Sequence, residues 1–95
     1  MEFNLPAATA RYANIAVALG CKVKGSEIET AKAGIEILRK LAASCDIPLK
    51  LSEINIPEHS IQGIAEMAMT VQRLLKNNVR EVTLEDALNI YKQAY

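Results

Sequence analysis

The sequence has few aromatic residues and few valines for its length. Its 95 residues include one Phe, three Tyr and no Trp, and 5 Val against 14 Ala, 10 Leu and 10 Ile. Strands are enriched in Val and aromatic residues, whereas Ala and Leu are strong helix formers. The composition therefore argues against a β-sheet protein and predicts an all-α fold, a small bundle of four main helices with short connections. The length suits one small domain, so we expect residues 1–95 to form a single helical domain.

Neither sign of charge is in excess. Eleven Lys and Arg residues balance eleven Asp and Glu, and the sequence pI is about 6.6. Because there is no basic surplus to neutralise phosphates, we expect no nucleic acid and no membrane as partner. No uncharged apolar run approaches the roughly 18 residues of a membrane span, and the start of the chain lacks the basic and apolar regions of a secretory signal. A cytoplasmic location is the expectation.

Residues that carry chemistry are scarce and scattered. The one histidine, His59, stands beside Glu58, and two adjacent ligands cannot close a metal site, which favours an exposed residue at a helix start. Cys21 and Cys45 have no CxxC spacing and no neighbouring His, which favours buried or half-exposed thiols in a reducing compartment. The glycines form no phosphate-binding motif. We therefore predict no catalytic, cofactor-binding or metal-binding residue in this chain.

Apolar residues repeat with the period of an α-helix in four segments. The predicted helices span residues 8–19, 26–45, 57 or 60 to 74, and 84–95. Gly20 suits the left-handed conformation that ends a helix, Ser26 with Glu29 forms a capping-box pattern, and Thr83 is a further N-cap. Residues 49–56 are short and mixed, so they form either a strand-like linker or one helical turn, and we favour the turn.

Finer expectations concern the exposed and buried sides of these helices. Glu36 lies four residues from both Lys32 and Lys40, so these opposite charges fall together on the side of the second helix that we expect to face solvent. On the third helix, the pattern predicts a packed Met67 and a partly exposed Met69.

Three segments match, in order, the patterns of one enzyme family. Residues 1–20 have the form M-x-[FY]-N followed by [RK]-[YF]-x-x-I-A-x-x-[LM]-G, and residues 45–49 are similar to a G-I-P-x-x-L connection between helices. Residues 75–95 contain a loop of the type N-P-R-x-x-T and a helix that ends near I-Y-x-x-A-[YW]. On these motifs the whole chain resembles the C-terminal end of iron-containing (group III) alcohol dehydrogenases. The chain departs from the family at Val79, where the loop usually has proline, and keeps only part of the middle motif.

The resemblance implies a function for a parent enzyme rather than for the chain alone. Such an enzyme oxidises an alcohol with NAD(P) and holds Fe²⁺, or another divalent metal, on ligands that we expect upstream of Met1. We therefore expect a C-terminal helical fragment of an NAD(P)-dependent alcohol dehydrogenase, inactive by itself, whose partner is the rest of that enzyme. A cloned fragment and a truncated gene product are both open. The alternative is a free-standing helical protein–protein interaction module derived from the same family.

The resemblance also points to one loop as the part that faces the catalytic cleft of the intact enzyme. The candidate residues are Leu74, Asn77, Asn78 and Arg80. The competing interpretation is a solvated connection in which Asn78 and Arg80 bond to helix ends. In either case the four apolar stripes offer more apolar surface than so small a domain needs for itself, which predicts self-association of the isolated chain.

Overall fold

A computed structural model describes all residues from 1 to 95 and contains helices and turns but no strand. The all-α prediction is confirmed. The chain divides into two compact units, Met1–Ile47 and Pro48–Tyr95, which we describe separately. No helix combines the length and the apolar character that a membrane span requires.

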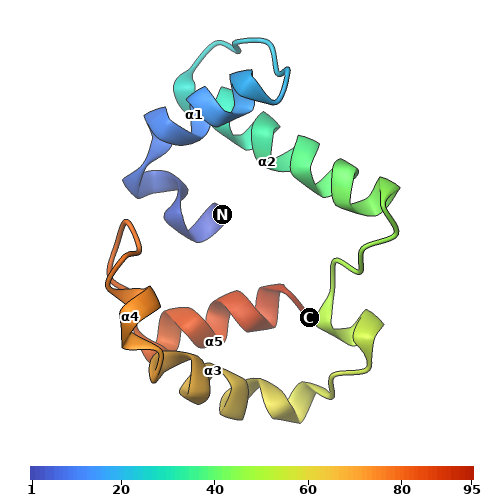
Figure 1. Ribbon diagram of the computed structural model, residues 1–95, viewed down its shortest axis with the longest axis vertical. Coiled ribbons are helices and arrows are strands. Elements are labelled where there is room, and N and C mark those ends of the chain that lie inside the picture. Colours follow the sequence, from blue (N-terminus) through green and yellow to red (C-terminus); the bar gives the residue numbers. More distant parts are fainter. The chain divides into compact units, whose positions relative to one another are not determined.

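The first unit is a helical hairpin preceded by a short 3₁₀ helix (Figure 1). Its elements are η1 (Glu2–Ala7), α1 (Thr9–Ala18) and α2 (Glu27–Ser44). The two α-helices agree with the predicted ranges 8–19 and 26–45, whereas η1 was not expected. The buried cluster of this unit consists of small and medium side chains, with Tyr12 packed against it: Leu5, Ala13, Ala31 and Ile35.

Helices α1 and α2 approach each other closely because small residues face each other where they meet. Ala16 has no exposed surface, and a Cβ built on Gly34 would lie 2.5 Å from the Cβ of Ala16 and 2.8 Å from its Cα. Only a residue without a side chain fits between α2 and α1 at this distance. The larger aliphatic Ile15, which the periodicity places on the same stripe, is 46% exposed.

Both α-helices of this unit end in the same hydrogen-bonding pattern. After α1, the amides of Gly20 and Cys21 donate to the carbonyls of Val17 and Ala16, each at 2.9 Å, and Gly20 has the predicted positive φ of 90°. After α2, the amides of Asp46 and Ile47 donate to Ala43 and Ala42 at 3.1 and 3.0 Å, and Asp46 has a φ of 56°. These are Schellman motifs, and the second uses Asp where glycine is the common residue.

The loop before α2 is fastened by one residue that the sequence did not single out. Ser26 caps α2 by accepting from the Glu29 amide at 3.3 Å, as predicted, but Glu29 does not return the second bond of a capping box. Instead Thr30, which is buried, accepts from the Lys24 amide at 2.8 Å and donates to the Ser26 carbonyl at 3.1 Å. A buried hydroxyl that uses both its lone pair and its proton satisfies the backbone of this turn.

The second unit is built on two packed helices. Its elements are η2 (Leu51–Ile54), η3 (Glu58–Ser60), α3 (Ile61–Met69), α4 (Gln72–Leu75) and α5 (Leu84–Gln93). Helices α3 and α5 pack together, and the buried residues there are Ile61, Ala65 and Ala87. The helical turn favoured for residues 49–56 is present as η2. Two hydrogen bonds of 2.8 Å connect it to the end of the chain: the Leu51 amide donates to the Ala94 carbonyl, and Ser52 Oγ donates to the Tyr95 carbonyl.

The predicted continuous helix from residue 57 or 60 to 74 is wrong in one respect: it is broken between α3 and α4. Thr70 Oγ1 donates to the Met67 carbonyl at 2.7 Å, and Val71 has φ −84° and ψ 61°. The Gln72 amide donates to the Thr70 carbonyl at 2.9 Å, so Val71 is the centre of an inverse γ-turn. The Thr70 hydroxyl donates to a backbone carbonyl of the last turn of α3. This local bond competes with the regular helical hydrogen bond, which favours the end of α3 at this point.

The charged side of α2 is exposed as predicted, but the ion pair that forms there is a different one. Lys32, Glu36 and Lys40 are exposed and form no ion pairs with one another, and Arg39 of the same helix instead pairs with Glu2 of η1. The reason is tertiary, since η1 folds back over α2 and brings its carboxylate within reach. On α3 the packing role predicted for Met67 is wrong, because Met67 is 73% exposed, whereas Met69 is partly exposed as predicted. Met67 follows the buried Ala65 by two residues, which places it nearly on the opposite side of the helix.

Candidate functional site

The loop from α4 to α5 was the predicted cleft-facing segment, and its end is anchored by a capping box. Thr83 Oγ1 accepts from the Asp86 amide at 3.2 Å, and the Asp86 carboxylate accepts from the Thr83 amide at 3.0 Å and from its hydroxyl at 2.8 Å. These two bonds from Thr83, the amide first and the hydroxyl second, lower the pKa of Asp86 from its ordinary value of 3.8, and the charge of Arg80 acts in the same direction. The predicted start of the last helix at Thr83 is confirmed.

Two of the four candidate residues meet in this loop. Asn78 Nδ2 donates to the Arg80 carbonyl at 2.8 Å, so the side chain of Asn78 holds the turn that presents Arg80. Asn78 is half-buried and Arg80 is exposed. The proximity of Arg80 to Asp86 places its guanidinium near the N-terminal end of α5.

The other two candidates lie on α4 and just after it, away from that turn. Asn77, just past the helix end, donates from Nδ2 to the Arg73 carbonyl at 3.0 Å and so completes the last turn of the helix. Leu74 is 61% exposed. The four residues therefore do not converge on one point.

A pocket of about 510 Å³ lies over the loop and adjoins α3, α4 and the segment before α5. Asn78 and Arg80 line it, but Leu74 and Asn77 do not. Lys76 and Arg80 supply two cations against the one carboxylate of Glu81, which makes the pocket a polar site with a small positive excess. Its lining residues are Met69, Gln72, Leu75, Lys76, Asn78, Val79, Arg80, Glu81 and Val82.

The sequence identified only two of the residues that line this pocket, Asn78 and Arg80. In the sequence, Met69 and Leu75 appear only as apolar residues of a predicted helix, and Gln72 lines the pocket as the first residue of α4, which is separate from α3 because the helix is interrupted at Val71. No pattern in the sequence predicts the break at Val71, so the sequence did not indicate that Met69, Gln72 and Leu75 would line one pocket with the loop.

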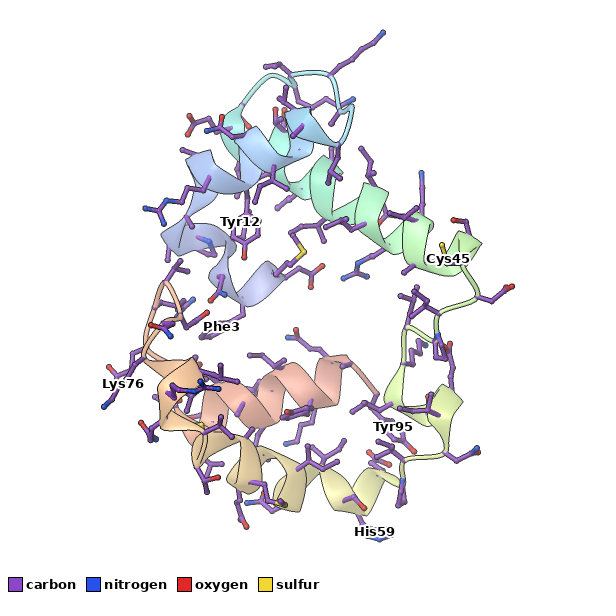
Figure 2. All side chains as sticks on the ribbon, in the orientation of Figure 1. Phe3, Tyr12, Cys45, His59, Lys76 and Tyr95 are labelled. Carbon is purple, nitrogen blue, oxygen red and sulfur yellow. The ribbon has the colours of Figure 1, made fainter.

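The remaining titratable candidates do not gather into a site. His59 lies exposed in η3 before α3, as predicted, and projects outward in Figure 2. The thiols of Cys21 and Cys45 are both free; Cys21 is half-buried as expected, whereas Cys45, at the end of α2, is more exposed than expected. No group of three or more His, Cys, Asp or Glu side chains is placed to hold a metal ion. The residues of this chain therefore do not fit a complete iron site.

An all-α chain with open pockets and many exposed aliphatic side chains is typical of a helical part of a larger protein. A sequence profile described as "Fe-containing alcohol dehydrogenase family, C-terminal" matches residues 1–95. The chain belongs to this family, and the resemblance read from its three motifs is confirmed.

Individual relatives agree with this assignment. Lactaldehyde reductase of Escherichia coli K12 is 30% identical over 96 residues, which cover 100% of this chain and 25% of the reductase, and the protein of strain O157:H7 matches equally well. Among solved structures, a 1,3-propanediol oxidoreductase superposes with a TM-score of 0.91 at 26% identity, covering 99% of this chain and 25% of that protein. The chain thus spans one quarter of the length of these relatives.

Proposed function

We propose that this chain acts as the C-terminal helical part of an iron-dependent, NAD(P)-linked oxidoreductase that interconverts an alcohol and the corresponding aldehyde. The observation that carries the proposal is the match of the whole chain, without a gap at either end, to the C-terminal family profile. The names of the relatives, lactaldehyde reductase and 1,3-propanediol oxidoreductase, support small hydroxylated substrates.

The metal and the nicotinamide cofactor belong to the rest of that enzyme. Within this chain no set of three ligating side chains converges, and its glycines form no nucleotide-binding motif. We therefore propose that the 95 residues alone turn over no alcohol, and that they work in the cytoplasm as one helical domain joined to a metal- and cofactor-binding portion.

The contribution of this chain to the active site, in our proposal, is a wall built from the loop after α4. Asn78 is bonded to the backbone of Arg80 and both line the polar pocket, which supports these two residues as the part that approaches the cleft. Leu74 and Asn77, which do not line the pocket, are proposed to face the cleft from α4 and from the residue after its C-cap.

A chimera tests the proposal directly. The C-terminal 96 residues of E. coli lactaldehyde reductase, the stretch that this chain matches, are replaced by this chain, and NAD(H)-linked turnover of lactaldehyde and 1,3-propanediol is measured. The expected result is measurable activity that the separate 95-residue chain lacks. A soluble, folded chimera without activity on any tested alcohol would contradict the proposed function.

The alternative, a free-standing interaction module, is favoured by the number of large apolar side chains that face solvent. Examples from both units are Ile47, Met67 and Leu74, each more than half exposed. The DNA upstream of the coding region separates the two hypotheses: an in-frame cofactor loop and metal ligands support the dehydrogenase, whereas an unrelated upstream sequence supports the module.

A further inference from the structure

Side-chain hydrogen bonds hold the break between α3 and α4. A helix leaves its last carbonyls without partners in the helix itself. Here the Met67 carbonyl accepts a hydrogen bond from Thr70 Oγ1 at 2.7 Å. The Met69 carbonyl accepts from Gln72 Nε2, also at 2.7 Å, and the Thr70 carbonyl accepts from the Gln72 amide at 2.9 Å. The end of α3 is therefore satisfied without a further helical turn.

We call the pair Thr70 and Gln72 the α3–α4 clasp. Its two side chains bond back into the last turn of α3 from either side of Val71, whose φ of −84° and ψ of 61° are not helical. Figure 1 shows that α4 turns away from the line of α3. The direction in which α4 leaves α3 therefore depends on the clasp.

This direction decides which residues the loop after α4 meets. Met69 and Gln72, from the two sides of the break, line the polar pocket together with Asn78 and Arg80. In a helix that continued through Val71, residue 78 would lie roughly 14 Å further along the axis than residue 69. A pocket of about 510 Å³ could not then include both. The break is therefore necessary for the pocket.

The loop needs such a restraint at its start. Residues 76–82 contain neither proline nor glycine, so no residue with special backbone preferences fixes their path. The bond from Asn78 Nδ2 to the Arg80 carbonyl closes the turn, and the capping box at Thr83 holds its far end. The clasp is the corresponding restraint at the near end.

We propose that Thr70 is a positioning residue for the alcohol site of the intact enzyme. By ending α3 it sets the direction of α4, and so it holds Asn78 and Arg80 where they form the wall of the cleft. The proposal rests on the proposed function. Thr70 does not line the pocket, so it acts through the clasp and touches no substrate. Gln72 lines the pocket, and its substitution would not separate these two roles.

Ser44 provides a matched control. At the end of α2, Ser44 Oγ donates to the Leu41 carbonyl at 2.7 Å, so its bond has the same length and the same spacing of three residues as the bond of Thr70. Both side chains are exposed. Ser44 lies in the first unit and lines no part of the polar pocket. Removal of either hydroxyl takes away one bond of the same kind, but only Thr70 directs the loop.

Steady-state kinetics of the lactaldehyde reductase chimera test the proposal. In Thr70→Val, kcat/KM for lactaldehyde should fall at least about threefold through a higher KM, since a displacement of about 1 Å can cost up to roughly a hundredfold. The KM for the nicotinamide cofactor, which binds outside this chain, should change by less than about twofold. Thr70→Ser keeps the hydroxyl and should restore the KM for lactaldehyde. Ser44→Ala should leave both KM values unchanged.

Amide hydrogen exchange gives a second measurement that does not depend on activity. The amides of Gln72, Leu74, Leu75 and Lys76 are hydrogen-bonded at the start of α4. In the 95-residue chain, Thr70→Val should raise their exchange rates by about tenfold, whereas Thr70→Ser and Ser44→Ala should not. If Thr70→Val does not fold, Thr70→Ala takes its place in both experiments.

The outcomes separate the positioning role from the function on which it rests. If the parent chimera is active and the KM for lactaldehyde rises no more in Thr70→Val than in Ser44→Ala, the positioning role is overturned and the function stands. An equal rise in the KM for the cofactor overturns it too, because the defect would then be a general loss of structure. Unchanged amide exchange in Thr70→Val overturns the clasp. An inactive but folded parent chimera overturns the proposed function, and the positioning role falls with it.

Discussion

The contact between Gly34 and Ala16 gives the sharpest test of the packing in this chain. In most helices Gly→Ala is stabilising by about 0.8–1 kcal/mol, because alanine loses less conformational entropy. At Gly34 the added Cβ would lie 2.5 Å from the Ala16 Cβ and 2.8 Å from its Cα, against an ordinary carbon–carbon contact of about 3.5–4.0 Å. Neither partner atom can rotate away, so α1 and α2 must separate by about 1 Å.

That separation weakens the packing between α1 and α2 along the whole hairpin. Ala13, Ala16, Ala31 and Ile35 are all buried near this contact, and a radial gap of 0.5–1 Å removes roughly a quarter to a half of each dispersion contact. Overpacking of a core costs about 1–3 kcal/mol. After the gain in helix propensity is subtracted, Gly34→Ala should lower the free energy of unfolding by up to about 2 kcal/mol, which corresponds to a fall of up to roughly 15 °C in the melting temperature of a domain of this size.

Gly63 is the matched control. It also lies within a helix, α3, but a Cβ built on it meets nothing within 4 Å. Gly63→Ala should therefore raise the free energy of unfolding by up to about 1 kcal/mol. Both variants are compared with the parent chain in urea and thermal denaturation followed by circular dichroism. If Gly34→Ala raises the midpoint as Gly63→Ala does, the close approach of α1 and α2 is not present in solution.

Four further predictions concern helix ends and association. Thr83→Ala removes the cap of α5 and should cost about 0.5–2 kcal/mol in urea denaturation. Because the pKa of Asp86 is lowered in the folded chain, the ionised carboxylate should stabilise the fold fully above pH 3.8, and this stabilisation should be lost as the pH falls through the lowered pKa. Denaturation measured between about pH 5 and pH 2 should show this loss for the parent chain and not for Asp86→Asn. Asp46→Gly should raise stability by about 0.5–1 kcal/mol, since Asp46 has a positive φ that glycine adopts without strain, whereas Gly20→Ala should lower it by a similar amount. The isolated chain should self-associate in sedimentation equilibrium at high concentration, because apolar residues of both units face solvent.

Each of these has a clear contrary result. An unchanged midpoint for Thr83→Ala would mean that the capping box does not hold α5. Identical pH profiles for the parent and Asp86→Asn would remove the role of that carboxylate. Asp46→Gly and Gly20→Ala should change the free energy of unfolding in opposite directions, so a change in the same direction would contradict the reasoning on positive φ. A single species near 10.4 kDa at all concentrations, with no binding of a hydrophobic dye, would contradict self-association.

Cooperativity of unfolding tests the expected single domain. If residues 1–95 form one domain, Gly34→Ala in the first unit and Thr83→Ala in the second should each shift the whole transition. Two separate transitions, each moved by only one of the variants, would show that the units unfold independently.

Local features of the fold could be predicted because they depend on residues close in sequence. Ser26 and Thr83 cap the amide three residues on, and Gly20 adopts the left-handed conformation at the end of α1. The loop with Asn78 and Arg80 was identified from a family resemblance, and two of its four candidate residues meet there. The pocket around them was not foreseen, because Met69 and Gln72 reach it only through the break at Val71.

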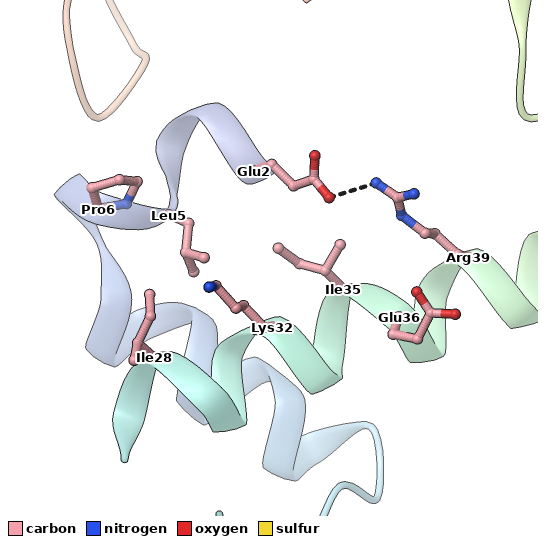
Figure 3. Close-up of a pocket in the computed structure, with 8 residues that line it drawn as sticks. All are labelled: Glu2, Leu5, Pro6, Ile28, Lys32, Ile35, Glu36 and Arg39. Carbon is pink, nitrogen blue, oxygen red and sulfur yellow. Dashed lines mark hydrogen bonds and ion pairs between the residues drawn. The ribbon is translucent and has the colours of Figure 1, made fainter. Parts of the chain in front are cut away.

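The sequence by itself determined the all-α class, the ends of most helices and the family, since helix propensity, capping and motif order are properties of neighbouring residues. Tertiary structure decided which residues of each apolar face are buried most deeply. Periodicity ranked Ile15 with Ala16, but Ala16 is fully buried against Gly34 while Ile15 is 46% exposed. Small side chains let two backbones approach, and this shape match between α1 and α2 outweighs the larger transfer free energy of one isoleucine. Tertiary structure also decides which charges meet, because η1 folds back over α2 and brings the carboxylate of Glu2 to Arg39 (Figure 3).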